Sequence, residues 1–152
     1  MAGRIAVQSD DFDAATELAA LTNGRCDIGA VVSFIGLCRD EGGRLAALEL
    51  EHYPAMAEKK IRAIVDEASA RWPLLGVTVI HRYGKIDPGG QIVLVLVTSS
   101  HRRASFEAAE FLMDYLKTRA PFWKREHLKT GEAGEWVEAR DIDDEAMARW
   151  YK

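Results

Sequence analysis

The stretch Met113-Asp-Tyr-Leu-Lys117-Thr-Arg-Ala-Pro121-Phe-Trp-Lys124-Arg-Glu126 joins the end of a predicted helix to the start of a predicted strand. Pro121 cannot continue the helix, because it lacks an N–H and its ring clashes with the preceding turn. The apolar residues on the helical side recur at the spacing of one helix face: Phe106, Ala109, Met113 and Leu116. The sequence therefore predicts a long amphipathic helix, from about Arg103 to Arg119, that stops at a turn before a strand.

Basic residues flank this turn on both sides: Lys117, Arg119, Lys124 and Arg125. On an unbroken helix Lys117 and Lys124 would stand about 10 Å apart, and a turn at Pro121 can bring them closer, onto one anion. Basic residues at a helix end also have a structural explanation, because they interact favourably with the helix dipole. The number of cations beyond the proline favours an anion site over that explanation.

A second basic cluster, Ser99-Ser-His101-Arg102-Arg103, lies between a predicted buried strand and the N-terminus of the long helix. Free N–H groups at a helix N-terminus attract anions, whereas arginines there oppose the helix dipole. This conflict with local preference favours a ligand site, and the alternative is that the serines only cap the helix. Arg39, in a glycine-containing loop, and Arg140, after the last strand, are further cationic candidates.

Length and composition limit the possible classes of protein. The 152 residues favour a single domain spanning 1–152, and 48% hydrophobic with 29% charged residues indicates a globular chain. The net charge of −4 argues against a general nucleic-acid binder. The chain shows no signal-peptide-like start and no apolar run of the ~18 residues that a membrane span needs, so we expect a soluble, cytoplasmic protein without a membrane partner.

The two cysteines, Cys26 and Cys38, show neither CxxC pairing nor a histidine at metal-ligand spacing, so we expect no metal site. Cys38 has no base beside it in sequence and is expected to be inert. The sequence also lacks a Walker loop, a dinucleotide-binding glycine motif, a nucleophile elbow and a zinc-protease motif. The residues favour a cationic pocket for a phosphate-bearing ligand, with one or two lysines available for proton transfer.

Periodicity and turn residues predict the order strand–helix–strand–strand–helix–strand–strand–helix–hairpin, followed by a short helix. Ser9, Asp10 or Asp11 is expected to cap the first helix. Ile28 to Phe34 is nearly all apolar, as in a strand covered on both faces. Parallel strands need a crossover between them, which several neighbours lack. We therefore predict an α+β fold, a mixed or antiparallel sheet with packed helices and a C-terminal β-hairpin.

Several runs of residues carry a resemblance to a known family: Gly29-Ala-Val-Val-Ser-Phe-Ile-Gly36 with Arg39, Leu50-Glu-His-Tyr-Pro54-Ala-Met56, Val79-Ile-His-Arg82, Ser100-His-Arg102, and the stretch from Met113 to Glu126. In these runs the sequence resembles the large, catalytic subunit of molybdopterin synthase, the MoaE family, over nearly the whole chain. The resemblance implies a sulfurtransferase of molybdenum cofactor biosynthesis, which converts cyclic pyranopterin monophosphate into molybdopterin by installing a dithiolene. The sulfur arrives as a thiocarboxylate on the C-terminal glycine of a small ubiquitin-like partner subunit.

The resemblance also implies roles for individual residues. Lys117 and Lys124 match the two essential lysines of the family, Lys117 beside the partner's tail. The implied substrate-binding residues are Arg39, His101, Arg102, Arg125, Glu126 and Arg140, the last in its own or the neighbouring subunit's pocket. The family forms a homodimer of large subunits with a small subunit at each end, a heterotetramer, and no cofactor is implied. The sequence departs from the family at Leu37, often a basic residue, and in a short loop over 40–44.

Two other functions fit part of the pattern. A non-catalytic docking module for a ubiquitin-like tail would keep the aromatic turn but would not need both Lys117 and Lys124. An enzyme acting on a sugar phosphate or a nucleotide would use a similar cationic pocket and would need no protein partner.

Overall fold

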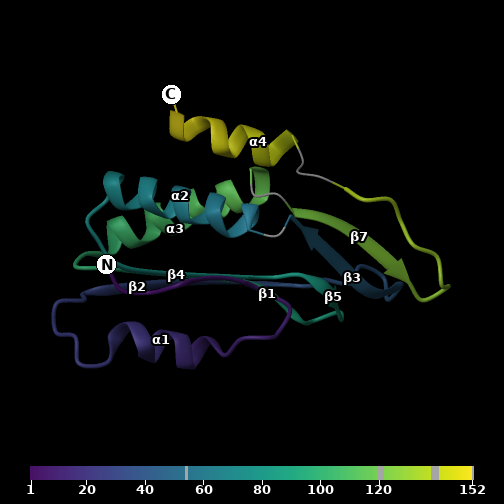
Figure 1. Ribbon diagram of the computed structural model, residues 1–152, viewed down its shortest axis with the longest axis horizontal. Helices are drawn as coiled ribbons and strands as arrows, with labels where there is room; N and C mark the ends of the chain where they lie inside the picture. The colour runs from purple at the N-terminus through teal and green to yellow at the C-terminus, as the bar shows by residue number, and fades with distance from the viewer. Residues whose placement is uncertain (54, 120–121, 138–140, 152) are drawn as a thin grey trace.

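The computed structural model describes residues 1–53, 55–119, 122–137 and 141–151 and, within these ranges, holds two β-sheets with helices packed against them (Figure 1). The larger sheet has the order β1-β4-β6-β2, with β1 parallel to β4 and the other pairs antiparallel. Its strands are β1 (Ile5–Gln8), β4 (Leu74–Arg82), β6 (Gln91–Ser99) and β2 (Ala30–Leu37). The smaller sheet is antiparallel and consists of β5 (Gly84–Ile86), β3 (Leu45–His52) and β7 (Phe122–Leu128). The predicted α+β class is confirmed.

Helices cover both faces of the larger sheet (Figure 1). α2 (Met56–Arg71) and α3 (Arg102–Thr118) lie on one face and α1 (Ala14–Thr22) on the other, while α4 (Asp141–Ala148) lies over α2 and α3. The core beneath α2 and α3 is centred on fully buried residues such as Ile61, Val79, Val95, Phe111 and Leu112. None of the helices in the described ranges combines the length and the apolar character that crossing a bilayer requires.

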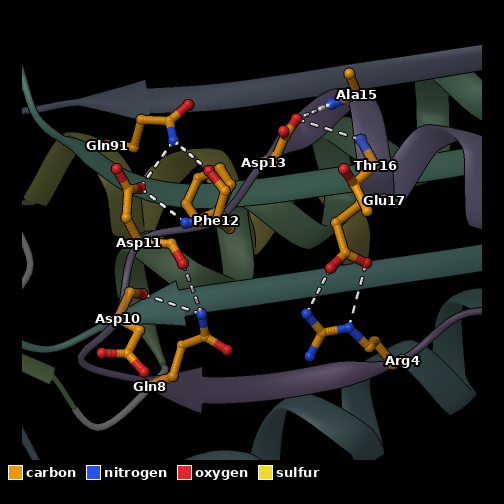
Figure 2. Close-up of polar contacts among 10 residues, drawn as sticks. All are labelled: Arg4, Gln8, Asp10, Asp11, Phe12, Asp13, Ala15, Thr16, Glu17 and Gln91. Carbon is orange, nitrogen blue, oxygen red and sulfur yellow. Dashed lines mark hydrogen bonds and ion pairs between the residues drawn. The ribbon is translucent and has the colours of Figure 1, made fainter.

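Side chains at the N-terminus of α1 fix this helix to the sheet, as Figure 2 shows. The Asp13 carboxylate is the cap and accepts hydrogen bonds from the backbone N–H groups two and three residues later, at 3.0 and 3.3 Å. The prediction that one of residues 9–11 caps the helix is wrong. Asp11 instead accepts hydrogen bonds from the Phe12 N–H and from the Gln91 side chain, both at 2.8 Å, and so ties the turn to β6.

Replacing Asp13 with alanine is expected to lower the free energy of unfolding by about 1 kcal/mol, because two N–H groups at the start of α1 lose their acceptor. Chemical denaturation measures this difference. Asp10→Ala is the matched control, since the one contact described for Asp10 is made by its backbone carbonyl; its change should stay within about 0.5 kcal/mol. An equal loss in both variants would mean that Asp13 acts through charge in the turn and not as a cap.

β2 is an edge strand of the larger sheet, because β6 is its only neighbour in the strand order of the described residues. The prediction that this apolar strand is covered on both faces is also wrong, because side chains on both of its faces are exposed. Val31, Ile35 and Leu37 alternate along one face and are 37%, 39% and 56% exposed, and Phe34 on the opposite face is 39% exposed. A continuous apolar run indicates a strand, but it does not distinguish a central strand from an edge that another surface covers.

α3 begins and ends within one residue of the predicted bounds, and the predicted apolar face is confirmed at Ala109 and Leu116, which are buried, and at Met113, which packs against the core. Phe106, expected on the apolar face, is 61% exposed, so that assignment is wrong. The buried residues of α3 include Ala104, Ala108, Phe111, Leu112 and Tyr115. The buried face is thus wider than the predicted series and includes Ala109 and Leu116, while Phe106 lies outside it.

The C-terminal turn Arg149–Tyr151 closes the helical layer with an aromatic cluster. The Trp150 ring lies edge-on to Trp72 and to Phe111, with centroids 5.7 and 5.5 Å apart. The Trp150 Nε1–H donates a hydrogen bond to the Asp114 carboxylate at 2.7 Å. The end of the chain is thereby attached to both α2 and α3.

After β7 the chain turns back alongside the same strand, as the predicted hairpin requires. Gly131 has a φ of +91° in the turn, and isolated bridges pair Lys124 with Val137 and His127 with Ala133. The returning segment of the hairpin thus pairs with β7 at isolated bridges and does not form a second full strand. Its predicted end at residues 138–140 lies outside the described residues.

Candidate active site

The end of α3 and the start of β7 carry the two candidate lysines (Figure 1). Lys117 is exposed in the last turn of α3, where a basic side chain also interacts well with the helix dipole. Lys124 is half-buried in β7 and lies opposite Leu50 of β3. The turn predicted at Pro121 falls on residues 120–121, outside the described residues.

His81 of β4 is a buried histidine that lies near both lysines. Its ring stacks on Phe122 of β7, with centroids 3.8 Å apart and an interplanar angle of 15°. Burial lowers the pKa of His81 to about 4, and the charges of Lys117, His52 and Lys124 lower it as well, against a hydrogen bond to a backbone carbonyl that raises it. Charges from the end of α3 and from β7 therefore act on one buried ring, which places the two lysines in the same region.

Arg125 of β7 adds a guanidinium group to this end of the molecule. Its Cζ lies 4.2 Å from the centroid of the Trp136 ring, a cation–π contact that holds the side chain. Its Nε is buried and has no hydrogen-bond partner among the described residues. A buried donor without an acceptor is costly, and an anionic ligand would supply the missing acceptor. The neighbouring Glu126 is exposed.

Arg39 lies in the loop that follows β2. Its side chain is 81% exposed and forms an ion pair with Glu41. β2 is antiparallel to β6, and α3 follows β6 and runs back over the sheet, so β2 and α3 end on the same side of the molecule. Arg39 is therefore at the same end of the sheet as Lys117.

His101 and Arg102 lie at the opposite end of α3. His101 is the N-cap, Arg102 is the first helical residue, and both side chains are exposed. The turn between β6 and α3 is fixed by the Ser99 hydroxyl, which donates to the His101 carbonyl at 2.5 Å and lies 2.5 Å from the Ser105 hydroxyl. α3 has 17 residues, so the ends of this helix stand about 24 Å apart. A single copy of the chain does not bring His101 and Arg102 to Lys117.

Arg140 lies outside the described residues. Within the described residues, no group of three or more His, Cys, Asp and Glu side chains could hold a metal ion. Cys38 is 2% exposed, and burial raises the pKa of its thiol. Burial and a raised pKa both disfavour the thiolate that a nucleophilic cysteine requires.

The lysine end of the molecule has the groups that anion chemistry needs. Two amines can bind a phosphate or a carboxylate. Beside them, His81 remains uncharged at neutral pH because its pKa is lowered to about 4. The sequence analysis singled out both lysines but not His81. His81 follows the apolar strand residues 77–80. This pattern indicates a buried side chain, but it does not show which other side chains lie nearby.

Comparison with known proteins gives a consistent result. The family model described as MoaE protein matches residues 7–119. The molybdopterin synthase catalytic subunit of Mesorhizobium japonicum is 63% identical over 99% of this chain and 94% of its own length. A MoaE protein structure from Burkholderia ambifaria has a TM-score of 0.84 at 48% identity, covering 99% of both chains. A complex of subunits 1 and 2 of molybdopterin-converting factor from Helicobacter pylori shares the fold, with a TM-score of 0.72 at 19% identity over 90% of both chains.

Proposed function

Because this chain belongs to the MoaE family, whose named relatives are molybdopterin synthase catalytic subunits, we propose that it is a sulfurtransferase acting with a small ubiquitin-like subunit. Membership of the family assigns the chain to molybdenum cofactor biosynthesis. The proposed reaction moves sulfur from the C-terminal thiocarboxylate of the small subunit to cyclic pyranopterin monophosphate, in the cytoplasm, and forms the dithiolene of molybdopterin. The observation that carries the proposal is the pair Lys117 and Lys124, whose charges act on one buried ring.

Each residue at the lysine end has a role in this reaction. Lys117 lies beside the tail, where its ammonium group stabilises the oxyanion that forms when water attacks the carbonyl carbon bound to the transferred sulfur, a step that breaks the C–S bond and leaves a carboxylate on the tail. Lys124 moves protons to or from the pterin. The buried Nε of Arg125 donates to an anionic oxygen of the substrate. Arg39, at the same end of the sheet, pairs with the phosphate once it leaves Glu41, and Glu126 orients polar groups of the pterin.

The positions of His101 and Arg102 require a second copy of the chain in the site. One end of α3 carries these residues and the other carries Lys117, about 24 Å away. A twofold axis can pair two copies so that their α3 helices run in opposite directions. His101 and Arg102 of one copy then lie at the lysine end of its partner. Each site of the homodimer is then composite, with the lysines from one copy and a phosphate-binding helix N-terminus from the other. Arg140 is assigned to this composite site as well.

The edge strand β2 is the surface we assign to this dimer. β2 starts at Ala30, whose carbonyl lies 3.5 Å from the Ser105 hydroxyl of α3, and ends at Leu37 beside the Arg39 loop. Antiparallel pairing of two copies of β2 would align the start of one strand with the end of the other, as the composite site requires. It would also cover the exposed Val31, Ile35 and Leu37.

An exposed aromatic surface near Lys124 fits the tail of the small subunit. Tyr53 is 50% exposed and lies edge-on to Trp123, with centroids 4.7 Å apart, and Met56 nearby in sequence is 47% exposed. Apolar contacts of this kind anchor a peptide while lysines bind its terminal carboxylate. The Helicobacter pylori complex, which contains two subunits, supports a small-subunit partner.

Reconstitution tests the proposal. The purified chain is mixed with a thiocarboxylated small subunit and cyclic pyranopterin monophosphate, and the dithiolene product is quantified. Product is expected only when all three components are present. Binding of the small subunit without turnover would favour a docking module, and turnover of a phosphate substrate without the small subunit would favour an enzyme of another class.

Mixing two inactive variants tests the composite site. Lys117→Ala and His101→Ala should each be inactive alone, because each removes one half of every site. After dissociation and equal mixing, subunits that reassemble at random should recover about a quarter of the wild-type sites, since each mixed dimer contains one intact site. Activity is assayed before and after mixing. No recovery from folded, dimeric mixtures would mean that the two residues act in the same copy, which the geometry of α3 opposes.

A further inference from the structure

Two buried hydroxyl groups lie at the start of α3, and the proposed reaction makes no use of them. Ser99 is the last residue of β6, Ser105 lies in the first turn of α3, and both are fully buried. Their hydroxyl oxygens lie 2.5 Å apart. The Ser99 oxygen also lies 2.5 Å from the backbone carbonyl oxygen of His101. The hydroxyl pair Ser99 and Ser105 therefore connects the core to a candidate substrate-binding residue.

The chemistry of the three groups determines the direction of each hydrogen bond. A carbonyl oxygen can only accept, so the single hydroxyl proton of Ser99 goes to the His101 carbonyl. Ser105 must then donate to the Ser99 oxygen, because Ser99 has no second proton to give. Ser99 therefore makes the bond to His101, and Ser105 acts on His101 only through Ser99.

His101 caps α3 without using its side chain. An N-cap residue usually accepts a hydrogen bond on its side chain from the first helical turn, which favours Ser, Thr, Asp and Asn at that position. Within the described part of the chain, the exposed His101 side chain makes no capping hydrogen bond. The Ser99 hydroxyl instead holds this residue from the core side, through the backbone carbonyl. The imidazole is thereby left available to contact a ligand.

The start of the larger sheet's edge strand fixes the backbone that precedes His101. The Gly29 N–H, next to β2, donates to the Ser99 carbonyl at 3.0 Å. A Cβ at Gly29 would lie 2.0 Å from the Ser100 carbonyl oxygen, so no side chain fits between the two backbones. With residues 99 and 100 held in this way, the hydroxyl of Ser99 is the contact that acts on His101 itself.

We propose that Ser99 is a positioning residue, whose buried hydroxyl fixes the backbone of His101 and so directs the imidazole toward the pterin substrate. The part of His101 in substrate binding rests on the proposed function, whereas the hydrogen bond from Ser99 rests on the geometry alone. Without this bond the imidazole spreads over more orientations, and the substrate must order it on binding, which weakens the affinity.

Ser99→Ala and Ser105→Ala separate positioning from packing. Each removes one fully buried hydroxyl from the same pair, but Ser99→Ala alone removes the bond to His101. Calorimetric titration measures the binding of cyclic pyranopterin monophosphate to the homodimer. Ser99→Ala should weaken binding about fivefold, the worth of one hydrogen bond, and Ser105→Ala by less than about twofold. Both should lose similar stability in denaturant, so equal losses of affinity in the two variants would overturn the proposal.

A double-mutant cycle shows whether Ser99 acts through His101. Affinity is measured in place of turnover, because His101→Ala is expected to be inactive. Adding Ser99→Ala to His101→Ala should leave the affinity unchanged, since there is no longer an imidazole to direct. A further loss of about fivefold in that background would mean that Ser99 acts on binding by another route, against the proposal.

A measurement without substrate tests the contact itself. From ¹⁵N relaxation, the backbone order parameter of His101 should be about 0.85 in the wild type and in Ser105→Ala, and should fall toward about 0.6 in Ser99→Ala. An unchanged order parameter in Ser99→Ala would overturn the proposal. Failure of the folded wild-type dimer to bind the pterin would instead reject the proposed function, and the order parameters would still decide whether Ser99 holds His101.

Discussion

Replacing Lys117 with alanine is expected to lower sulfur transfer by about a hundredfold or more while leaving the fold intact. Lys117 is exposed at the end of α3, so the alanine side chain leaves no cavity in the core. What is lost is the amine that stabilises the oxyanion in the proposed reaction. The measurement is single-turnover product formation from a thiocarboxylated small subunit.

Lys60→Ala is the matched control, because Lys60 is also an exposed helical lysine but lies on α2. Its rate should equal that of the wild type. Near-normal turnover in Lys117→Ala would remove this lysine from the mechanism. A loss of similar size in both variants would point to a general effect of surface charge on association with the small subunit.

Replacing Phe111 with alanine is expected to have the largest effect on stability, a loss of about 3–5 kcal/mol in the free energy of unfolding. Phe111 is fully buried in α3, and its ring lies 5.4 Å from that of Trp72 and 5.5 Å from that of Trp150. The Arg71 guanidinium lies 4.8 Å from the same ring. Removing it leaves a cavity between α2, α3 and the C-terminal turn.

Phe106→Ala on the same helix is the control, because Phe106 is 61% exposed. Its effect on unfolding by denaturant should stay within about 0.5 kcal/mol. The pair tests the face of α3 directly. Losses in the reverse order would restore the sequence-based assignment, in which Phe106 belongs to the apolar stripe.

The fold class could be predicted from the sequence because local patterns encode its elements. The long periodic segment gave α3 to within one residue at each end, and the helix-free connection from β4 to β6 agrees with their antiparallel pairing. The pattern could not show that β2 is an edge strand. A continuous apolar run is expected for a strand covered by a helix and equally for one covered by another subunit. It also could not show that Phe106 lies outside the buried face of α3, although the other residues of the predicted stripe pack against the core.

The candidate site was predictable in its parts and not in its arrangement. Charge and the proline identified Lys117 and Lys124, and the resemblance to a family assigned their roles. The sequence analysis did not take into account that the length of α3 separates His101 from Lys117. Both residues were therefore assigned to one cationic site. The stacking of His81 on Phe122 was not predicted, because it joins two sheets and no local pattern encodes such contacts.

The number of residues in α3 fixes the distance between its ends and also the directions of its side chains around the helix axis. Inserting or deleting one residue within its 17 would turn everything beyond the change by about 100° and shift it by about 1.5 Å. The Lys117 side chain would then point in a different direction relative to the buried face of α3, even if the helix itself stayed intact. The loop over 40–44 has no such constraint, since Gly42 and Gly43, with φ of +76° and +70°, can absorb a change in chain length. We therefore expect this chain to tolerate a change of one residue in that loop but not within α3.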